Sequence, residues 1–244
     1  MSIIRAHYGA APRKTYFAGG SSGGREGLIA VSNWPADFDG LIAMFPAWNA
    51  VALDLQFGRI TRALAQPGAY PNPKKRKRLY DAGIAACDAL AIDPSSPERF
   101  QSRIVQLNGL QDANKTDLSA FRARGGKILM AHGTVDALVS SQATRQYMER
   151  LFRTMGKETV SDFVRYCEIP GYAHVVSTAF NAAWDSLTML ENWTERDAPP
   201  SNPIVVDTYG VVGRTRPLCD YLSWPRYKGI GDVNAAASFA CTTQ

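Results

Sequence analysis

Apolar and polar positions along the chain predict short strands separated by helices. Four short apolar runs, each bounded by glycine, proline or polar residues, are typical of buried strands. They cover residues 15–19, 38–46, 127–131 and 163–167. Apolar residues at helical spacing predict helices at 24–33, at 140–155 and in a final segment with Phe180, Trp184, Leu187 and Leu190 on one face. This alternation predicts an α/β fold, a parallel sheet with helices on both faces.

Residues 50–124 interrupt this alternation. The segment contains several prolines, a run of basic residues and only short helical pieces. In open α/β folds ligands bind outside the carboxyl ends of the strands, so an insertion over that edge would act as a lid. We therefore expect a discontinuous core, residues 1–49 with 125–244, and a lid insertion at 50–124.

Composition and charge narrow the classes of partner. The chain has 244 residues, of which 45% are hydrophobic and 20% charged, and no apolar run reaches the roughly 18 residues of a membrane span. Much of the net charge of +5 comes from the basic run Lys74–Arg78, which resembles a nucleic-acid patch. No zinc-finger spacing or RNA-binding signature accompanies it, so a solvated helix start after Pro73 is the simpler interpretation. We expect neither a nucleic-acid nor a membrane partner.

The first predicted strand and helix meet at Gly19-Gly20-Ser21-Ser22-Gly23. A G-x-S-x-G turn between a strand and a helix is typical of a nucleophile elbow, in which a tight turn exposes the serine hydroxyl. Ser21 is then the candidate nucleophile, and the backbone amide of Ser22 a candidate oxyanion donor. The alternative is a glycine-rich turn without chemistry.

A nucleophilic serine needs a base and an acid that orients the base. Of the three histidines, His7 precedes the elbow, whereas His174 lies in a loop just after the fourth strand. Asp136 lies in the loop after the third strand. The order Ser21, Asp136, His174 is that of α/β-hydrolases, so these residues form the predicted catalytic triad. His132 is the alternative base, and we interpret it as orienting the Asp136 loop.

Several segments together carry a resemblance to a known family. They are residues 16–25, 34–40, 45–47, 132–136, 170–174, 216–219, 227–229, 231–234 and 239–241. Over nearly its whole length the chain resembles the tannase and feruloyl esterase family. The resemblance implies an α/β-hydrolase with a lid, a serine carboxylesterase that cleaves aromatic esters of the galloyl or feruloyl type. It also favours a secreted or periplasmic location, although the first residues do not form a signal peptide.

The chain departs from the family's pattern at its cysteines and its calcium loop. Many members carry a disulfide beneath the triad at the positions of Gly20 and Val175, so packing alone must hold His174 near Ser21 here. The family's calcium loop retains only its first acidic position, Asp88, and we expect no metal and no other cofactor. Elsewhere, Cys219 and Cys241 flank a glycine-rich tail segment that a disulfide could staple in an oxidising compartment.

The start of the chain bears on the second oxyanion donor. Family members have a segment upstream of the elbow strand that supplies it, and nothing in this sequence replaces that segment. The strand at 15–19 would then have an unpaired edge, so we expect that the chain either forms a homodimer or is a fragment or remnant. The alternative to an esterase is therefore a truncated, weakly active or inactive relative that serves as a binding or structural protein.

Overall fold

The structure, a computed structural model, describes residues 2–68, 96, 100–201 and 203–243. The chain divides into two compact units. We call residues 1–48 with 115–244 the core unit, and residues 49–114 the insert unit. The predicted lid overlaps the insert unit, and its role as a lid stays a prediction.

The core unit is built on a four-stranded parallel sheet in the order β1-β2-β3-β4. The strands are β1 (Tyr16–Gly20), β2 (Gly40–Met44), β3 (Lys127–Gly133) and β4 (Val164–Ile169). The sheet register places Gly20 beside Met44, Met44 beside Ala131, and Ala131 beside Cys167. The carboxyl ends of the strands therefore meet at one edge, where the loops after β1, β3 and β4 lie together.

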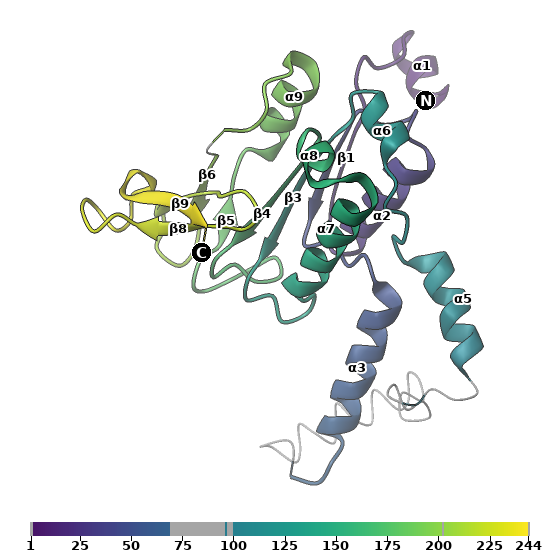
Figure 1. Ribbon diagram of the computed structural model, residues 1–244, viewed down its shortest axis with the longest axis horizontal. Coiled ribbons are helices and arrows are strands. Elements are labelled where there is room, and N and C mark those ends of the chain that lie inside the picture. Colours follow the sequence, from purple (N-terminus) through teal and green to yellow (C-terminus); the bar gives the residue numbers. More distant parts are fainter. Residues whose placement is uncertain (1, 69–95, 97–99, 202, 244) are drawn as a thin grey trace. The chain divides into compact units, whose positions relative to one another are not determined.

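Helices cover both faces of this sheet, which confirms the predicted fold class (Figure 1). Ile42 and Leu129 pack against Leu190 of α9 (Ser186–Arg196) on one face. Leu41 points to the opposite face, because side chains alternate along a strand, and it lies against Gly27 of α2 (Ser22–Asn33). The amphipathic helix α7 (Ser141–Met155) shares the α2 face, since its Thr144 contacts His132 of β3. Three short helices complete this unit: α1 (Ser2–Tyr8), α6 (Ser119–Ala123) and α8 (Lys157–Ser161).

The tail folds into two small antiparallel sheets that the sequence analysis does not predict. One contains β5 (Ala182–Ala183), β6 (Ile204–Asp207) and β7 (Thr215–Pro217). The other pairs β8 (Ser223–Tyr227) with β9 (Phe239–Thr243), which follows the 3₁₀ helix η2 (Ala236–Ser238). A disulfide joins Cys219 to Cys241, whereas Cys167 on β4 is a free thiol that is 3% exposed. Burial raises the pKa of the Cys167 thiol.

Two predicted elements extend well beyond their observed bounds. The second strand ends at Met44 and not at residue 46, because Phe45 has a left-handed φ of 35° that cannot continue a strand. The final helix begins at Ser186, so Phe180 and Trp184 precede it. Both side chains nevertheless pack in the core, and their spacing therefore resembles that of a helix face.

The insert unit contains two described helices, α3 (Ala50–Leu64) and α5 (Gln101–Gln111), which pack against each other. The Val51 amide donates to Asp112 Oδ1 at 3.0 Å, which links the start of α3 to the end of α5. The basic run Lys74–Arg78 and the Asp88 segment lie outside the described residues. Among the helices that the structure describes, none is long and apolar enough to cross a membrane.

Candidate active site

Ser21 occupies a strained turn between β1 and α2. Its φ of 56° and ψ of −120° are unfavourable for a residue with a side chain, and such strain persists only where the surroundings enforce it. Here the Ser21 amide donates to Met44 O at 3.0 Å, and its carbonyl accepts from the Ala47 amide at 3.1 Å. The last residue of β2 and the segment after it thus hold the backbone of the serine on both sides.

Two of the glycines around Ser21, Gly19 and Gly24, are required by close backbone approaches. A Cβ atom at Gly19 would lie 2.5 Å from the carbonyl carbon of Gly23, a distance that real Cβ atoms do not show. A Cβ atom at Gly24 would lie 3.0 Å from Pro46 Cα. Gly19 and Gly24 are therefore needed for these approaches, whereas a Cβ atom at Gly23, the second glycine of the G-x-S-x-G pattern, would meet nothing within 4 Å.

Asp136 and His174 meet where β3 and β4 end. His174 Nδ1 donates to Asp136 Oδ2 at 2.7 Å, and the Asp136 side chain is fully buried. Asp136 Oδ1 accepts from the amides of Leu138 and Val139, both at 2.9 Å. Burial by itself raises the pKa of Asp136, but the hydrogen bonds from His132, His174 and the two amides outweigh it and lower that pKa to about 2. The carboxylate is therefore ionised at neutral pH and can orient an imidazole.

His132 is a second imidazole that contacts the Asp136 carboxylate. Its Nε2 lies 2.9 Å from Val139 O and 3.2 Å from Asp136 Oδ2, and both of these oxygens can only accept. Nε2 therefore carries the proton, and Nδ1 accepts from the Thr144 hydroxyl at 2.8 Å. The imidazole is completely buried and all its polar atoms are bonded, so His132 orients Asp136 and is not available to a substrate.

The structure brings Asp136 and His174 together, but it does not hydrogen-bond His174 to Ser21. Among the described residues, the Ser21 hydroxyl and His174 Nε2 make no hydrogen bond. Catalytic hydrogen bonds are often long in the absence of substrate, so this geometry does not exclude the pair. The Ser22 amide begins α2 and also donates to no described acceptor, which leaves it free for an oxyanion.

Backbone contacts join the loops that carry Asp136 and His174. The Gly171 amide donates to Thr134 Oγ1, and the Val135 amide donates to Tyr172 O, both at 3.1 Å. Next to these bonds, Gly133 passes the Tyr172 carbonyl so closely that a Cβ atom there would overlap it. Main-chain contacts, together with the hydrogen bond between His174 and Asp136, thus hold these two loops against each other.

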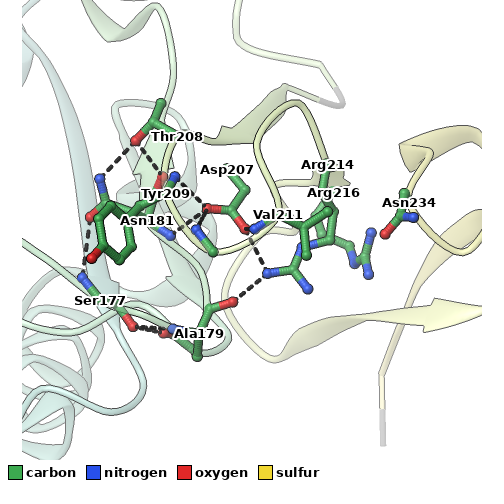
Figure 2. A network of polar contacts seen from close by, with 12 residues as sticks. Ser177, Ala179, Asn181, Asp207, Thr208, Tyr209, Val211, Arg214, Arg216 and Asn234 are labelled. Carbon is green, nitrogen blue, oxygen red and sulfur yellow. Dashed lines mark hydrogen bonds and ion pairs between the residues drawn. The ribbon is translucent and has the colours of Figure 1, made fainter.

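A buried carboxylate, Asp207, anchors the far end of the His174 loop (Figure 2). It accepts from the Asn181 amide at 2.9 Å, from three successive amides after residue 208, and from Arg214 at 2.6 Å. Arg214 also donates to Ala179 O. Burial raises the pKa of Asp207, but the backbone donors together outweigh that effect and hold the pKa far below its usual range.

A comparison with protein families shows which family the chain belongs to. The model of the tannase and feruloyl esterase family matches residues 1–94 and 90–242, which is nearly the whole chain. The chain belongs to the tannase and feruloyl esterase family. The two matched pieces overlap at residues 90–94, inside the segment 50–124 that is predicted to be a lid.

Individual members of the family are similar over different parts of the chain. An uncharacterised esterase of Agrobacterium fabrum, Atu5261, is 27% identical over 98% of this chain and 66% of its own length. A mono(2-hydroxyethyl) terephthalate hydrolase of Piscinibacter sakaiensis is 43% identical over 53% of this chain and 22% of its own. The crystal structure of feruloyl esterase B from Aspergillus oryzae has a TM-score of 0.78 at 19% identity, covering 99% of this chain and 72% of that one. The chain thus spans less than two thirds of the length of these two curated tannase-family relatives.

Two features of this family member escaped the sequence analysis. Phe45 lies against His174, with ring centroids 4.5 Å apart, although sequence alone gives no sign of that contact. Asp207 lies in the tail, far along the chain from any predicted site residue. Within the described residues no group of three or more His, Cys, Asp or Glu side chains is placed to hold a metal ion.

Proposed function

We propose that this chain is a carboxylic ester hydrolase with Ser21 as nucleophile, His174 as base and Asp136 as the orienting acid. The observation that carries the proposal is the 2.7 Å hydrogen bond from His174 Nδ1 to the buried Asp136 carboxylate. That bond fixes the tautomer of His174 so that its Nε2 carries a lone pair and can accept a proton.

The proposed reaction has two proton-transfer cycles. His174 Nε2 takes the proton from Ser21 as its oxygen attacks the ester carbonyl, and the Ser22 amide donates to the resulting oxyanion. The intermediate collapses when His174 returns the proton to the departing alcohol, which leaves an acyl-enzyme. Water then attacks the acyl group by the same route and releases the carboxylic acid, with Ser21 restored.

We further propose that the substrate is an apolar ester of an aromatic acid. Aliphatic side chains flank both members of the acid–base pair and are 53% to 59% exposed: Val135, Leu138, Val175 and Val176. Exposed apolar side chains beside polar catalytic groups suit a substrate whose body is apolar. Feruloyl esterases among the relatives, and the terephthalate hydrolase, are named for aromatic acids, which agrees with this choice.

A second candidate is a family member that binds such esters but turns them over weakly or not at all. The observation that favours it is the absence of a hydrogen bond from the Ser21 hydroxyl to His174 among the described residues. Without a base in reach, Ser21 would be an ordinary weak nucleophile.

Hydrolysis of methyl ferulate and methyl gallate by wild-type protein, Ser21→Ala and Ser22→Ala separates the two candidates. We expect Ser21→Ala to lower kcat on the order of 10⁴-fold or more, because the acyl-enzyme cannot form. Ser22→Ala keeps the backbone amide and should retain most of the activity. A fluorophosphonate probe should label the wild type and fail to label Ser21→Ala. Equal rates for wild type and Ser21→Ala would overturn the proposed mechanism.

A further inference from the structure

The segment from Met44 to Ala47 contacts both halves of the proposed site. Its backbone holds Ser21, through the bonds from the Ser21 amide to Met44 O and from the Ala47 amide to Ser21 O. Its one aromatic side chain, Phe45, points to the other half. The centroid of the Phe45 ring lies 4.5 Å from that of His174, with the two planes inclined by 54°.

The contacts of Phe45 fix its ring well enough for the ring to restrict the position of His174. Its side chain is 7% exposed, and its amide donates to Ala131 O at 2.7 Å. It is one of the described non-glycine residues with a positive φ, at 35°, a conformation that costs free energy and persists because neighbouring contacts impose it. The ring also packs in a buried cluster with Tyr172, which lies two residues before His174.

The same ring fills the space next to the nucleophile. A Cβ atom built on Gly20 would lie 2.8 Å from Phe45 Cε2 and 3.0 Å from Cζ. Gly20 immediately precedes Ser21, so the phenyl ring spans the gap between the residue before the nucleophile and the imidazole of the base. Gly20 has no turn requirement of its own, because its φ is not positive. The close approach of the ring is what excludes a side chain there.

We infer that Phe45 is a positioning residue, whose ring determines the position of the His174 imidazole relative to Ser21. The absence of a side chain at Gly20 leaves the space that the Phe45 ring occupies. The inference rests on the function proposed for this site. Among the described residues the only hydrogen bond of the His174 ring is the one from Nδ1, and a single bond leaves the ring free to tilt about it. Packing by Phe45 removes that freedom. Phe45 is therefore the residue that we propose for the expected packing against His174.

Truncation of the ring tests the inference first. We expect Phe45→Ala to lower kcat for methyl ferulate by roughly 10- to 100-fold with little change in KM, because a misplaced base slows chemistry more than binding. Phe45→Leu keeps most of the bulk and should recover most of kcat. The matched control is Phe163→Leu, which alters a buried phenylalanine outside the site. It should lower the melting temperature and leave kcat unchanged when assayed well below that temperature. If Phe45→Ala lowers kcat no more than Phe163→Leu does, the positioning role is wrong.

A double-mutant cycle tests the link to Gly20. In the wild-type background, Gly20→Ala should push the ring toward His174 and lower kcat by at least 10-fold. In the Phe45→Leu background, the added methyl group meets a smaller side chain, so Gly20→Ala should cost several-fold less. Additive effects of the two substitutions would show that the ring does not couple the two positions, and would overturn the inference.

A readout independent of turnover separates this inference from the proposed function. An aromatic ring 4.5 Å away shifts the His174 Hε1 proton resonance, which is assigned by its loss in His174→Gln. Phe45→Leu should move that resonance by several tenths of a part per million, and Phe163→Leu should not. If the wild type cleaves no ester but the shift occurs, the proposed function fails and the contact stands. If the resonance does not move, the positioning role fails whatever the activity.

Discussion

At the scale of single residues, Asp136 is the centre of the hydrogen-bond network of the proposed site. Its buried carboxylate accepts four hydrogen bonds, two from imidazoles and two from amides. An amide side chain in its place could keep the shape but would repel one of these donors, since Nδ2 donates and cannot accept. A substitution at Asp136 is therefore expected to change the tautomer and the orientation of His174 most strongly.

Asp136→Asn should reduce kcat by about 10³- to 10⁴-fold while KM changes little, because the imidazole adopts the wrong tautomer. Ester hydrolysis under saturating substrate measures this effect. The control is Asp117→Asn, an exposed aspartate whose side chain, among the described residues, bonds only to Ser119 nearby in the chain. That variant should have wild-type kinetics. Comparable loss in both variants would contradict the assignment of Asp136.

The same carboxylate predicts how stability depends on pH. Since folding lowers the pKa of Asp136 from 3.8 to about 2, its contribution of about 2 kcal/mol is fully present above pH 4. This contribution to stability is lost as the pH falls from 4 through 2, the range in which the Asp136 carboxylate of the folded protein becomes protonated. Urea melts between pH 2 and 6 should therefore show a shallower acid loss in Asp136→Asn than in the wild type. Identical slopes would show that folding does not perturb this group.

Sequence analysis could propose Asp136, Ser21 and His174 as a triad because each follows a strand and their order along the chain has a chemical meaning. The structure bonds two of them, Asp136 and His174. It could not find the role of Phe45, because its contact with His174 depends on a backbone conformation at residue 45 that a strand-like apolar run conceals. It could not find Asp207 either, since a buried carboxylate paired with backbone amides has no sequence pattern.

At the scale of elements, the start of α2 shows how neighbouring glycines differ in purpose. A Cβ atom at Gly23 would meet nothing within 4 Å, whereas one at Gly24 would press on Pro46 and on Met44 O. Gly23 is thus replaceable on steric grounds, and Gly24 is needed for the contact between α2 and the segment after β2.

Gly23→Ala should stabilise the protein by about 0.5 to 1 kcal/mol, because alanine favours a helix that has room for it. Gly24→Ala should destabilise it by about 1 to 3 kcal/mol through overpacking. Chemical denaturation of the two variants, made in the same helix one residue apart, measures the contrast directly. A common sign for both changes would mean that helix propensity alone governs this turn.

The strands of the central sheet were predictable because each is a buried apolar run with polar or glycine boundaries. The tail sheets were not, since β5 and β7 have two and three residues, too few for any periodicity. The start of the predicted final helix was wrong for a related reason. Phe180 is buried and Trp184 is partly buried against the same core clusters, and packing of both side chains can resemble a helix face.

At the scale of the whole molecule, the tail is held by one covalent link. The Cys219–Cys241 disulfide closes a loop with a sequence separation of 22, and it joins the segment before β8 to β9. In the chain-entropy account such a loop is worth about 3 kcal/mol, because the crosslink restricts the unfolded chain.

The double variant Cys219→Ser/Cys241→Ser should unfold at a lower denaturant concentration, with a loss of about 3 kcal/mol. Dithiothreitol should lower the stability of the wild type toward that of the variant and leave the variant itself unchanged. Equilibrium denaturation with and without reductant measures both effects. Equal stability of wild type and variant under oxidising conditions would show that the link does not contribute.

The free thiol of Cys167 can serve as a built-in probe of how often the protein core opens. The thiol lies on β4, the edge strand of the central sheet, where a β-bridge pairs Cys167 with Asp220 of the tail, and burial both shields the thiol and keeps it protonated. A thiol reagent can reach it only when the packing around β4 opens, so its labelling rate counts openings of this part of the core. Mass spectrometry of the Cys167 peptide would read that rate from native protein, without an added dye or a tag.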